Sequence, residues 1–264
     1  MGFYDYIRLI RFKYHITFIP VIIGALAFST EFSYALIKSL FLLYIAFNIF
    51  LYGGLYTFND ILDFKKDSEH SLKKKRPLPS GRINLKPAKI FSIIFVLLGL
   101  TMAFFYFGME IVYVFLTFII LNIIYSTIAK HIAYVDIFFN GITHLLRLLM
   151  GILLVTPNLE NKIYLLLIAY YCVAVGVIFA MRIMEKDIKG WEARKVLKNY
   201  TPKIILTFEI FFFIIILLLT FLSYPTYFYL YMLIGIAYLF IMLGINLSSK
   251  VRHALVMLMM RNEN

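Results

Sequence analysis

Apolar residues run along the chain in continuous blocks of about twenty, separated by short polar stretches. About twenty helical residues are needed to cross ~30 Å of hydrocarbon. The pattern therefore predicts eight membrane-spanning helices, at residues 14–32, 35–58, 90–108, 111–129, 137–155, 163–181, 204–224 and 226–247. Barrel strands alternate apolar and polar residues, so continuous blocks favour helices over a β-barrel. A further apolar run at 253–260 is too short to span and is expected to lie at the membrane surface.

Composition supports the same class of protein. Hydrophobic residues make up 62% of the chain and charged residues 15%, whereas soluble domains have about 45–50% and about 25%. No internal repeat or linker is visible, so we predict one domain over residues 1–264, an all-α polytopic integral-membrane helical bundle. The single cysteine, Cys172, lies in an apolar block and is expected to be a small buried residue, which excludes a disulfide framework.

Basic residues predict the orientation in the membrane. Of the 26 lysines and arginines, 23 fall at the termini or in the loops after the second, fourth and sixth spans. By the positive-inside rule, both termini and the large loops 59–89 and 182–203 face the cytoplasm, so the predicted location is the cytoplasmic membrane. The net charge of +12 is then explained by orientation in the membrane and by binding of anionic ligands or lipid headgroups. No nucleic-acid partner is expected. The oligomeric state stays open.

Polar chemistry concentrates just after the second predicted span, in NDILDFKKD. Asn59, Asp60, Asp63 and Asp67 lie along one face if that span continues as a helix beyond Phe58. Carboxylates that share a face repel one another unless a cation lies between them. Mg²⁺ suits such oxygen ligands and binds one or two carboxylates together with waters and substrate phosphates. The pattern predicts half of a Mg²⁺ site, with a diphosphate-bearing ligand supplying the other half.

The stretch that follows, HSLKKKRPLPSGR, places cations one short loop away from these aspartates. Its cationic donors are Lys73, Lys74, Lys75, Arg76 and Arg82, and the candidate phosphate contacts among them are Lys74, Lys75, Arg76 and Arg82. Proline and glycine favour a shaped loop here rather than another helix. A role in topology alone would also explain the lysines, but it does not explain spaced aspartates, because acidic residues contribute little to orientation.

Further polar residues fall inside the fifth predicted span, at steps that keep them on one helical face: Asp136, Asn140, Thr143, His144 and Arg147. A charged residue within a span is costly and indicates function by default. Arg147 is either part of a polar cavity wall that contacts substrate or the structural partner of Glu209, a carboxylate deep in the seventh span. Both interpretations stay open, and His144 is expected to be a buried hydrogen-bonding group.

These residues carry a resemblance. NDILDFKKD resembles the NDxxDxxxD signature of the UbiA prenyltransferase superfamily, and RPLPSG resembles the usual continuation of that signature. The resemblance implies a helical membrane fold, usually of nine spans, in which the aspartates bind a diphosphate through Mg²⁺ and an acceptor captures the carbocation left behind. It implies Asp60, Asp63 and Asp67 as catalytic residues and, together with Asn59, as metal ligands.

The second aspartate motif of that superfamily, DxxxD, is not intact, because Trp191 stands four residues after Asp187. Glu185 or Glu192 could substitute for the missing carboxylate. The chain instead resembles the decaprenyl-phosphate phosphoribosyltransferase branch, in NDILDFKKDSEH, in residues 125–151 and in 182–201. That branch moves 5-phosphoribose from phosphoribosyl pyrophosphate to a polyprenyl phosphate. The residue pattern and the resemblance together make the following residues candidates for substrate binding: Asn59, Lys74, Lys75, Arg76, Arg82, Arg147, Arg182, Glu185 and Asp187.

The sequence therefore favours phosphoribosyl transfer to a polyprenyl lipid. The first alternative is ordinary UbiA chemistry, in which a prenyl diphosphate donates its prenyl group to an aromatic or lipid acceptor. The second is a transporter, which intramembrane charges and basic loops also suit. Transporters tend to show paired repeats and helices broken at the midplane, and the sequence shows no such pairing.

Overall fold

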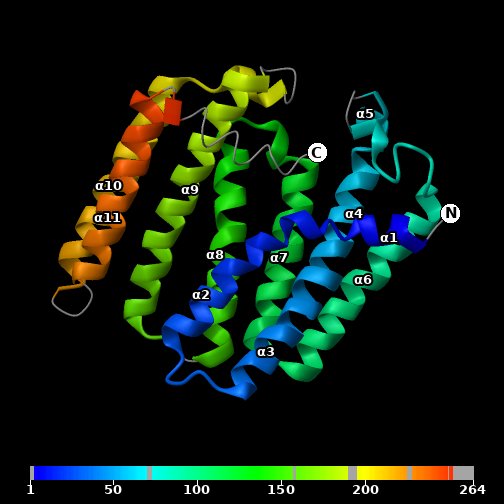
Figure 1. Cartoon of the computed structure of the whole chain (residues 1–264), viewed down its shortest axis with the longest axis horizontal. Coiled ribbons are helices and arrows are strands. Elements are labelled where there is room, and N and C mark those ends of the chain that lie inside the picture. Colours follow the sequence, from blue (N-terminus) through cyan, green and yellow to red (C-terminus); the bar gives the residue numbers. More distant parts are fainter. Residues whose placement is uncertain are drawn as a thin grey trace. The chain divides into compact units, whose positions relative to one another are not determined.

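The computed structural model describes residues 3–69, 73–156, 159–189, 195–224, 228–248 and 250–251. The regular elements of these residues are helical and follow one another in the order α1 (Phe3–Leu9), η1 (Phe12–Phe18), α2 (Ile19–Phe28), α3 (Tyr34–Tyr44), η2 (Ile45–Tyr52), α4 (Gly53–Leu62), α5 (Phe64–Glu69), η3 (Lys73–Lys75), α6 (Leu85–Tyr106), α7 (Met109–Thr127), η4 (Ala129–His131), α8 (Val135–Val155), α9 (Asn161–Lys189), η6 (Lys195–Asn199), α10 (Pro202–Leu222) and α11 (Phe228–Leu247) (Figure 1). The chain forms two compact units. One contains Met1–Thr127 with Leu146–Asn158, and the other contains Ile128–Leu145 with Leu159–Asn264.

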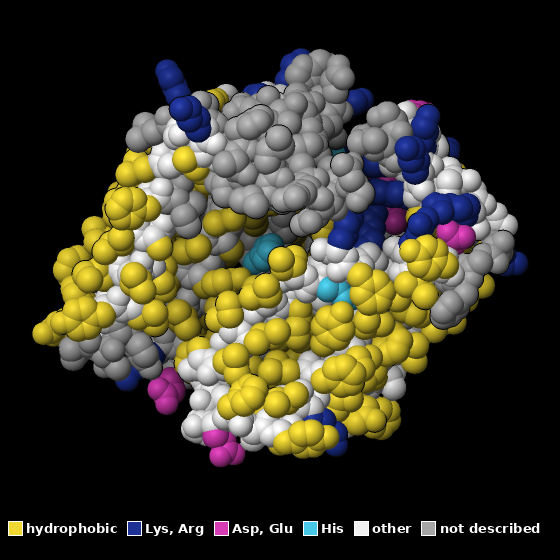
Figure 2. Space-filling view, in the orientation of Figure 1, with side chains coloured by type: hydrophobic (Ala, Val, Ile, Leu, Met, Phe, Trp, Pro, Cys, Tyr) yellow, Lys and Arg dark blue, Asp and Glu magenta, His cyan; other side chains and the backbone are white. Residues whose placement is uncertain are grey.

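Seven helical stretches within the described residues are long and apolar enough to cross a membrane: Tyr34–Leu62, Leu85–Tyr106, Met109–His131, Val135–Val155, Asn161–Lys186, Pro202–Leu222 and Phe228–Ile245. They coincide with seven of the eight predicted blocks, and they confirm the all-α polytopic membrane bundle. Large hydrophobic side chains cover much of the visible surface, while Lys and Arg gather beside α1 and α5 (Figure 2). The apolar run 253–260 lies outside the described residues.

The first predicted span, 14–32, is wrong as a full-length α-helix. The structure has the 3₁₀ helix η1 followed by the ten-residue α2, an apolar stretch of only Phe12–Phe28. Pro20 lies in the first turn of α2, where its missing N–H costs nothing, so α2 begins there as a separate helix. A 3₁₀ helix rises about 2.0 Å per residue and an α-helix about 1.5 Å, so the pair still reaches about 29 Å.

In the first unit, α4 and α6 run side by side at close range (Figure 1). A Cβ added at Gly54 of α4 would lie 2.8 Å from the Ser92 carbonyl, and one at Gly99 of α6 would lie 2.8 Å from the Ala46 carbonyl. The Ser92 hydroxyl donates a hydrogen bond of 2.8 Å to the Gly54 carbonyl. Small residues allow membrane helices to approach this closely, and van der Waals contact and polar bonds then hold them. This packing fixes the helix that carries the aspartate motif.

The second unit is built on α9, α10, α11 and the first half of α8. Its core includes Ile137, Cys172, Phe179, Phe212 and Tyr238, all buried. The buried position of Cys172 is the one predicted.

Candidate active site at the aspartate motif

The aspartate motif does not continue as one helix. α4 ends at Leu62, Asp63 takes φ −87° and ψ 1°, and α5 begins at Phe64. The helix continues beyond Phe58, as the prediction required, but it is interrupted at Asp63. The backbone of Asp63 lies in the sparsely allowed bridge region where many active-site residues are found. The side chains of the motif form two pairs, each with one residue before the break and one at or after it.

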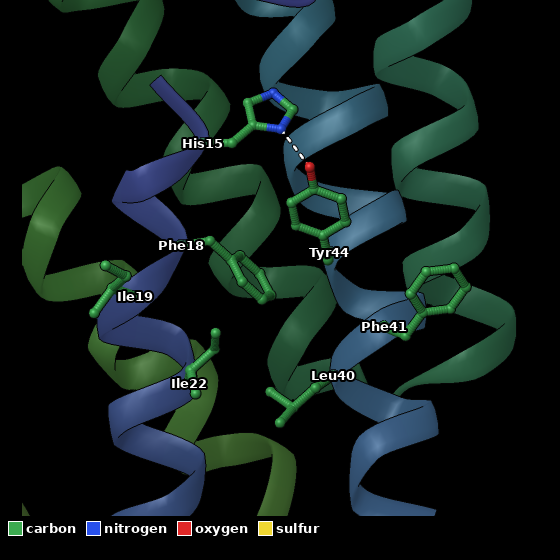
Figure 3. A pocket seen from close by; sticks show the side chains of 7 residues that line it. All are labelled: His15, Phe18, Ile19, Ile22, Leu40, Phe41 and Tyr44. Carbon is green, nitrogen blue, oxygen red and sulfur yellow. Dashed lines mark hydrogen bonds between the residues drawn. The ribbon is translucent and has the colours of Figure 1, made fainter. Parts of the chain in front are cut away.

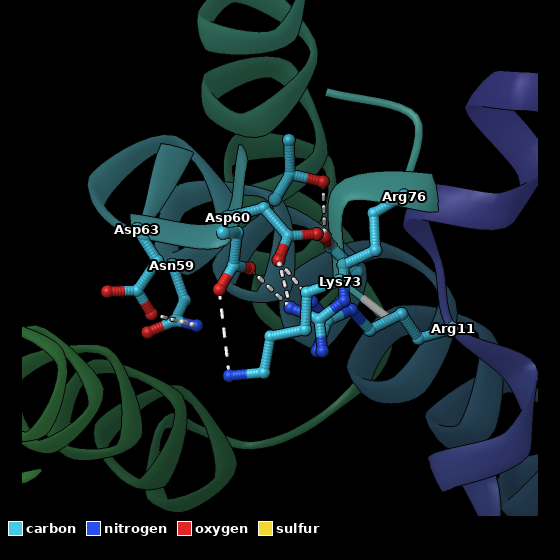
Figure 4. Close-up of polar contacts among 9 residues, drawn as sticks. Arg11, Asn59, Asp60, Asp63, Lys73 and Arg76 are labelled. Carbon is cyan, nitrogen blue, oxygen red and sulfur yellow. Dashed lines mark hydrogen bonds and ion pairs between the residues drawn. The ribbon is translucent and has the colours of Figure 1, made fainter. Parts of the chain in front are cut away.

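Asn59 and Asp63 form the first pair, in which the Asn59 amide donates to the Asp63 carboxylate over 3.3 Å. Asp60 and Asp67 form the second pair. Both are buried, with 2% and 1% of their surface exposed. Figure 4 shows Asn59 and Asp63 beside each other, on the side away from Arg11 and Arg76.

Three cations face the buried carboxylates of Asp60 and Asp67. Arg76 Nη1 lies 2.7 Å from Asp67 Oδ2 and 3.4 Å from Asp60 Oδ1, so one guanidinium joins the two acids. Lys73 Nζ lies 3.6 Å from Asp67 Oδ1, and Arg11 forms an ion pair with Asp60 Oδ1. Buried carboxylates carry a large desolvation penalty unless they are paired and hydrogen-bonded. The chain meets that requirement with its own cations.

Arg11 reaches this site from between α1 and η1, and its backbone has φ 55°, a left-handed conformation unusual for a residue other than glycine. Burial lowers the pKa of Arg11, but the Asp60 carboxylate and the neighbouring Tyr14 and Tyr56 raise it, and the net shift is upward. The guanidinium also lies over the Tyr56 ring at 5.1 Å. Sequence reasoning counted Arg11 only as a topology signal, because nothing local links it to an aspartate 49 residues away.

The predicted basic loop divides into two kinds of residue. Arg76 contacts the aspartates, whereas Lys74 and Lys75 are exposed. Arg82 forms an ion pair with Asp5 at 3.1 Å and donates to the Lys75 carbonyl at 2.5 Å, so it ties the loop to α1.

Apolar residues shape the same loop from beneath. Leu78 and Ile83 are buried against Leu9, and the Ile83 N–H donates to the Pro77 carbonyl at 3.1 Å. Gly81 takes φ 75°, which closes the turn at a position that other residues rarely tolerate. The loop is therefore shaped as predicted, and its shape presents Arg76 to the motif.

The donor set fits Mg²⁺ in its usual protein environment. Oxygens of Asp60 and Asp67 both lie within 3.4 Å of one guanidinium nitrogen, Arg76 Nη1, so a cation is stable between the two carboxylates. Mg²⁺ typically takes one or two carboxylates and completes its octahedron with waters and substrate phosphates. Within the described part of the chain, no three His, Cys, Asp or Glu side chains gather as a metal cage. The residues therefore fit Mg²⁺ that is shared with a phosphate-bearing ligand.

A second polar cluster lies in the other unit. Asp136 is fully buried and accepts hydrogen bonds from Arg182 Nε, at 3.1 Å, and from the Tyr200 hydroxyl. Arg182 Nη1 also donates to Glu185 at 3.1 Å. Two carboxylates thus hold the guanidinium of Arg182. The side chain of Asp187 and the whole of Trp191 lie outside the described residues.

Two tyrosines fasten this cluster to the chain that precedes α10. Tyr134 has φ 67°, and its N–H donates to the Tyr200 hydroxyl at 3.1 Å. In return, the Tyr134 hydroxyl donates to the Asn199 carbonyl and accepts from the Thr201 N–H. Burial and the hydrogen bond to Asp136 raise the pKa of Tyr200, so this phenol keeps its proton. Sequence reasoning missed Tyr134 and Tyr200 because neither belongs to a charged motif.

Arg147 is 1% exposed and lies in the first unit. Its guanidinium carbon is 4.9 Å from the ring centroids of both Tyr52 and Phe118 and 5.7 Å from that of Phe47. Cation–π contacts of this kind are strongest where water is excluded. The predicted pairing with Glu209 would join the two units and stays a prediction.

Comparison with known proteins identifies the family to which the chain belongs. The profile of the UbiA prenyltransferase family matches residues 17–261. A digeranylgeranylglyceryl phosphate synthase of Methanocaldococcus jannaschii is 43% identical over 101 residues, a match that covers 38% of this chain and only 34% of that relative.

Solved structures give the fold. A UbiA homologue from Archaeoglobus fulgidus, bound to GPP and Mg²⁺, superposes with a TM-score of 0.74 at 19% identity, over 92% of this chain and 87% of the other. A structure concerning digeranylgeranylglyceryl phosphate synthase in membranes gives a TM-score of 0.72 at 24% identity, over 97% and 93%. Since the family profile spans nearly the whole sequence, this chain belongs to the UbiA prenyltransferase family.

Proposed function

We propose that this chain is a Mg²⁺-dependent integral-membrane transferase that moves a prenyl group from a prenyl diphosphate to a lipid acceptor. The observation that carries the proposal is the pair of buried carboxylates, Asp60 and Asp67, joined through Arg76 with Lys73 beside them. Two comparisons support this donor: the 43% identical relative is named for a geranylgeranyl product, and the Archaeoglobus homologue was solved with GPP. On this support we place a prenyl diphosphate ahead of phosphoribosyl pyrophosphate, the donor that the sequence pattern favoured.

The residues of the motif have separable roles in this scheme. Asp60 and Asp67 would hold Mg²⁺, with Asn59 and Asp63 at the helix break as further oxygen donors. Mg²⁺ would supply charge neutralisation to the departing diphosphate. Arg76 and Lys73 donate to diphosphate oxygens, which gain negative charge as the transition state forms. Lys74 and Lys75, in the same 3₁₀ helix as Lys73, are candidates for the same contacts.

The transfer itself breaks the bond between prenyl C1 and the diphosphate oxygen, and the electron pair leaves with pyrophosphate. A hydroxyl oxygen of the acceptor forms the new bond to C1, and its proton passes to water. Arg11 forms an ion pair with the Asp60 oxygen that Arg76 also contacts, and we assign it as a positioning residue. We place the site on the cytoplasmic face of the cytoplasmic membrane, as the distribution of basic residues predicts.

Phosphoribosyl transfer to a polyprenyl phosphate is the second candidate. It is favoured by Trp191, which stands where DxxxD would place its second carboxylate, and by Arg182, held between Asp136 and Glu185. In that reaction Arg182 would face a lipid phosphate. Transport is a third alternative, in which no donor would be consumed.

One assay separates the three. Purified protein in lipid nanodiscs receives Mg²⁺, a polyprenyl lipid acceptor and either geranylgeranyl diphosphate or phosphoribosyl pyrophosphate, and pyrophosphate release is measured. We expect release with the prenyl diphosphate, and a loss of about 100-fold in kcat for Asp60→Asn and for Asp67→Asn. Glu110→Gln, which changes an exposed acid on α7, is the matched control and should stay at the wild-type rate.

Release with phosphoribosyl pyrophosphate alone would replace the proposal with the second candidate. Silence with both donors, from protein that remains folded and monodisperse, would refute transferase activity.

A further inference from the structure

Arg11 is held in an unusual conformation by contacts to both its backbone and its side chain. Its φ of 55° is left-handed, a conformation that persists in a residue other than glycine only where neighbouring contacts fix it. The guanidinium pairs with Asp60 of the aspartate motif, and the Arg11 side chain is only 13% exposed. The contacts that fix Arg11 therefore also bear on the orientation of this carboxylate.

His15 fixes the backbone that leads into Arg11. Its Nε2 lies 3.3 Å from the carbonyl oxygen of Ile10, and its Nδ1 lies 2.6 Å from the Tyr44 hydroxyl on α3. A neutral imidazole satisfies both contacts when Nε2 donates to the carbonyl and Nδ1 accepts from the hydroxyl. Figure 3 shows His15 and Tyr44 facing each other across an apolar pocket of about 330 Å³. His15 thus ties the turn at Arg11 to a neighbouring helix.

Two tyrosine rings face the guanidinium of Arg11. The guanidinium carbon lies 5.1 Å from the ring centroid of Tyr56 and 5.9 Å from that of Tyr14, and the two centroids are 5.4 Å apart. The face of an aromatic ring carries negative charge density that attracts a cation, most strongly where water is excluded. The rings therefore give Arg11 a second set of partners beside the Asp60 carboxylate.

Tyr56 is itself fixed by Tyr52, one helical turn earlier. Their ring centroids are 4.1 Å apart, and the Tyr56 hydroxyl donates to the Tyr52 hydroxyl over 2.8 Å. Tyr52 ends η2, a π-helical stretch of a kind that is frequent at functional sites. On the other side, the Arg147 guanidinium carbon lies 4.9 Å from the Tyr52 centroid. Rings and cations thus form a continuous series from buried Arg147 to the ion pair of Arg11.

We propose that Tyr56 and His15 are positioning residues of the metal site, and that both act on Asp60 through Arg11. Tyr56 holds the guanidinium, and His15 holds the backbone from which it extends. Without the ring, Arg11 depends more on Asp60, so a metal ion competes less well for that carboxylate. The inference rests on the proposed function for a Mg²⁺-bound diphosphate at the motif, but it is independent of the group that the diphosphate carries.

The probe for this role is magnesium pyrophosphate, which has no group to transfer. Its Kd is measured by titration calorimetry with the protein in nanodiscs of zwitterionic lipid. Tyr56→Leu should raise this Kd about fivefold, whereas Tyr56→Phe keeps the ring and should stay within about twofold of the wild type. His15→Leu should raise the Kd about threefold. Tyr113→Leu, at an exposed tyrosine of α7, is the matched control and should leave the Kd unchanged.

Double variants with Arg11→Gln decide whether these effects pass through Arg11. Neither Tyr56→Leu nor His15→Leu should change the Kd in the Arg11→Gln background, because the guanidinium that they position is gone. Equal fold-changes in the two backgrounds would overturn the inference, since a merely structural role acts whether or not Arg11 is present. An unchanged Kd for Tyr56→Leu, or a Tyr56→Phe variant that is equally impaired, would also overturn it. If Tyr56→Leu does not fold, Tyr14→Leu takes its place in the same cycle, because it removes the second ring that faces Arg11.

These binding results are independent of turnover. Protein that shows the dependence on Arg11 but consumes no prenyl diphosphate would refute the proposed function and leave the positioning role standing. An active prenyltransferase in which the substitutions act equally with and without Arg11 would do the reverse.

Discussion

Replacement of Asp136 by alanine tests whether the buried polar cluster of the second unit holds its helices together. The wild-type carboxylate is fully buried and accepts from Arg182 and from the Tyr200 hydroxyl. The substitution removes a charged hydrogen-bond acceptor, worth about 1.5–3 kcal/mol, and leaves a buried hydroxyl proton without its acceptor, at about 1–3 kcal/mol. Glu185 continues to face Arg182, so the guanidinium keeps one counter-ion. We expect a total loss of about 4 kcal/mol.

For a chain of this size, each kcal/mol lowers the melting temperature by about 2 °C, so Asp136→Ala should melt about 8 °C below the wild type. The assay is thermal unfolding in detergent, followed by light scattering and by the helical signal in far-UV circular dichroism. Asn140→Ala, one turn further along α8, is the matched control and should cost less than about 1 kcal/mol.

The double variant Asp136→Ala/Tyr200→Phe distinguishes the cluster from a general effect of truncation. Tyr200→Phe removes the stranded hydroxyl, so the two losses should fall short of additivity by about 1–2 kcal/mol. Strict additivity, or a melting temperature for Asp136→Ala within about 2 °C of the wild type, would refute the reasoning.

Three further predictions concern pH, packing and metal. Because the pKa of Tyr200 is raised in the folded state, its protonated phenol contributes stability that is fully present below the ordinary tyrosine pKa of about 10. That contribution is lost as the pH rises toward the folded-state pKa. The melting temperature of the wild type should therefore fall more steeply between about pH 10 and 11 than that of Tyr200→Phe. Gly54→Leu should lower the yield of folded protein on size-exclusion chromatography, because a Cβ there meets the Ser92 carbonyl, whereas Gly235→Ala meets only ordinary contacts and should be tolerated. Removal of Mg²⁺ with EDTA should abolish turnover. It should shift the melting temperature of donor-free protein by less than about 2 °C, because the chain's own cations already face Asp60 and Asp67. A larger drop would show that the metal is part of the fold.

The hydrophobic pattern was sufficient to predict the membrane-spanning helices, because bilayer thickness sets their length and the backbone of an apolar span can form its hydrogen bonds only within the helix. It failed at the first block, where Pro20 in the first turn of α2 separates a 3₁₀ segment from a short helix. The break at Asp63 is explained by the absence of the constraint that the bilayer imposes on a spanning helix. Beyond the bilayer edge, water can satisfy the backbone, so helical continuation is no longer enforced and side-chain pairing decides the conformation.

The candidate site shows where sequence reasoning ends. The aspartates were visible because their spacing is local, and Arg76 was visible because it follows within one loop. Arg11 could not be found, since its contact with Asp60 depends on how α1 packs against α4. The pocket lined by His15, Ile22 and Leu40 could not be found either, because it arises only where η1 and α2 meet α3.

Each of the two polar clusters contains one residue with a strained backbone. Arg11 and Tyr134 are the residues other than glycine with positive φ in the described part of the chain, and each contributes to one cluster. Arg11 turns its side chain to Asp60, and Tyr134 turns its N–H to the hydroxyl that Asp136 holds. A left-handed residue of this kind costs about 1–3 kcal/mol and persists only where surrounding contacts fix it. The ion pair with Asp60 supplies that contact for Arg11, and the hydrogen bond to the Tyr200 hydroxyl supplies it for Tyr134. Within each cluster, loss of this contact should release the strained backbone, and the buried carboxylate should then lose part of its fixed geometry.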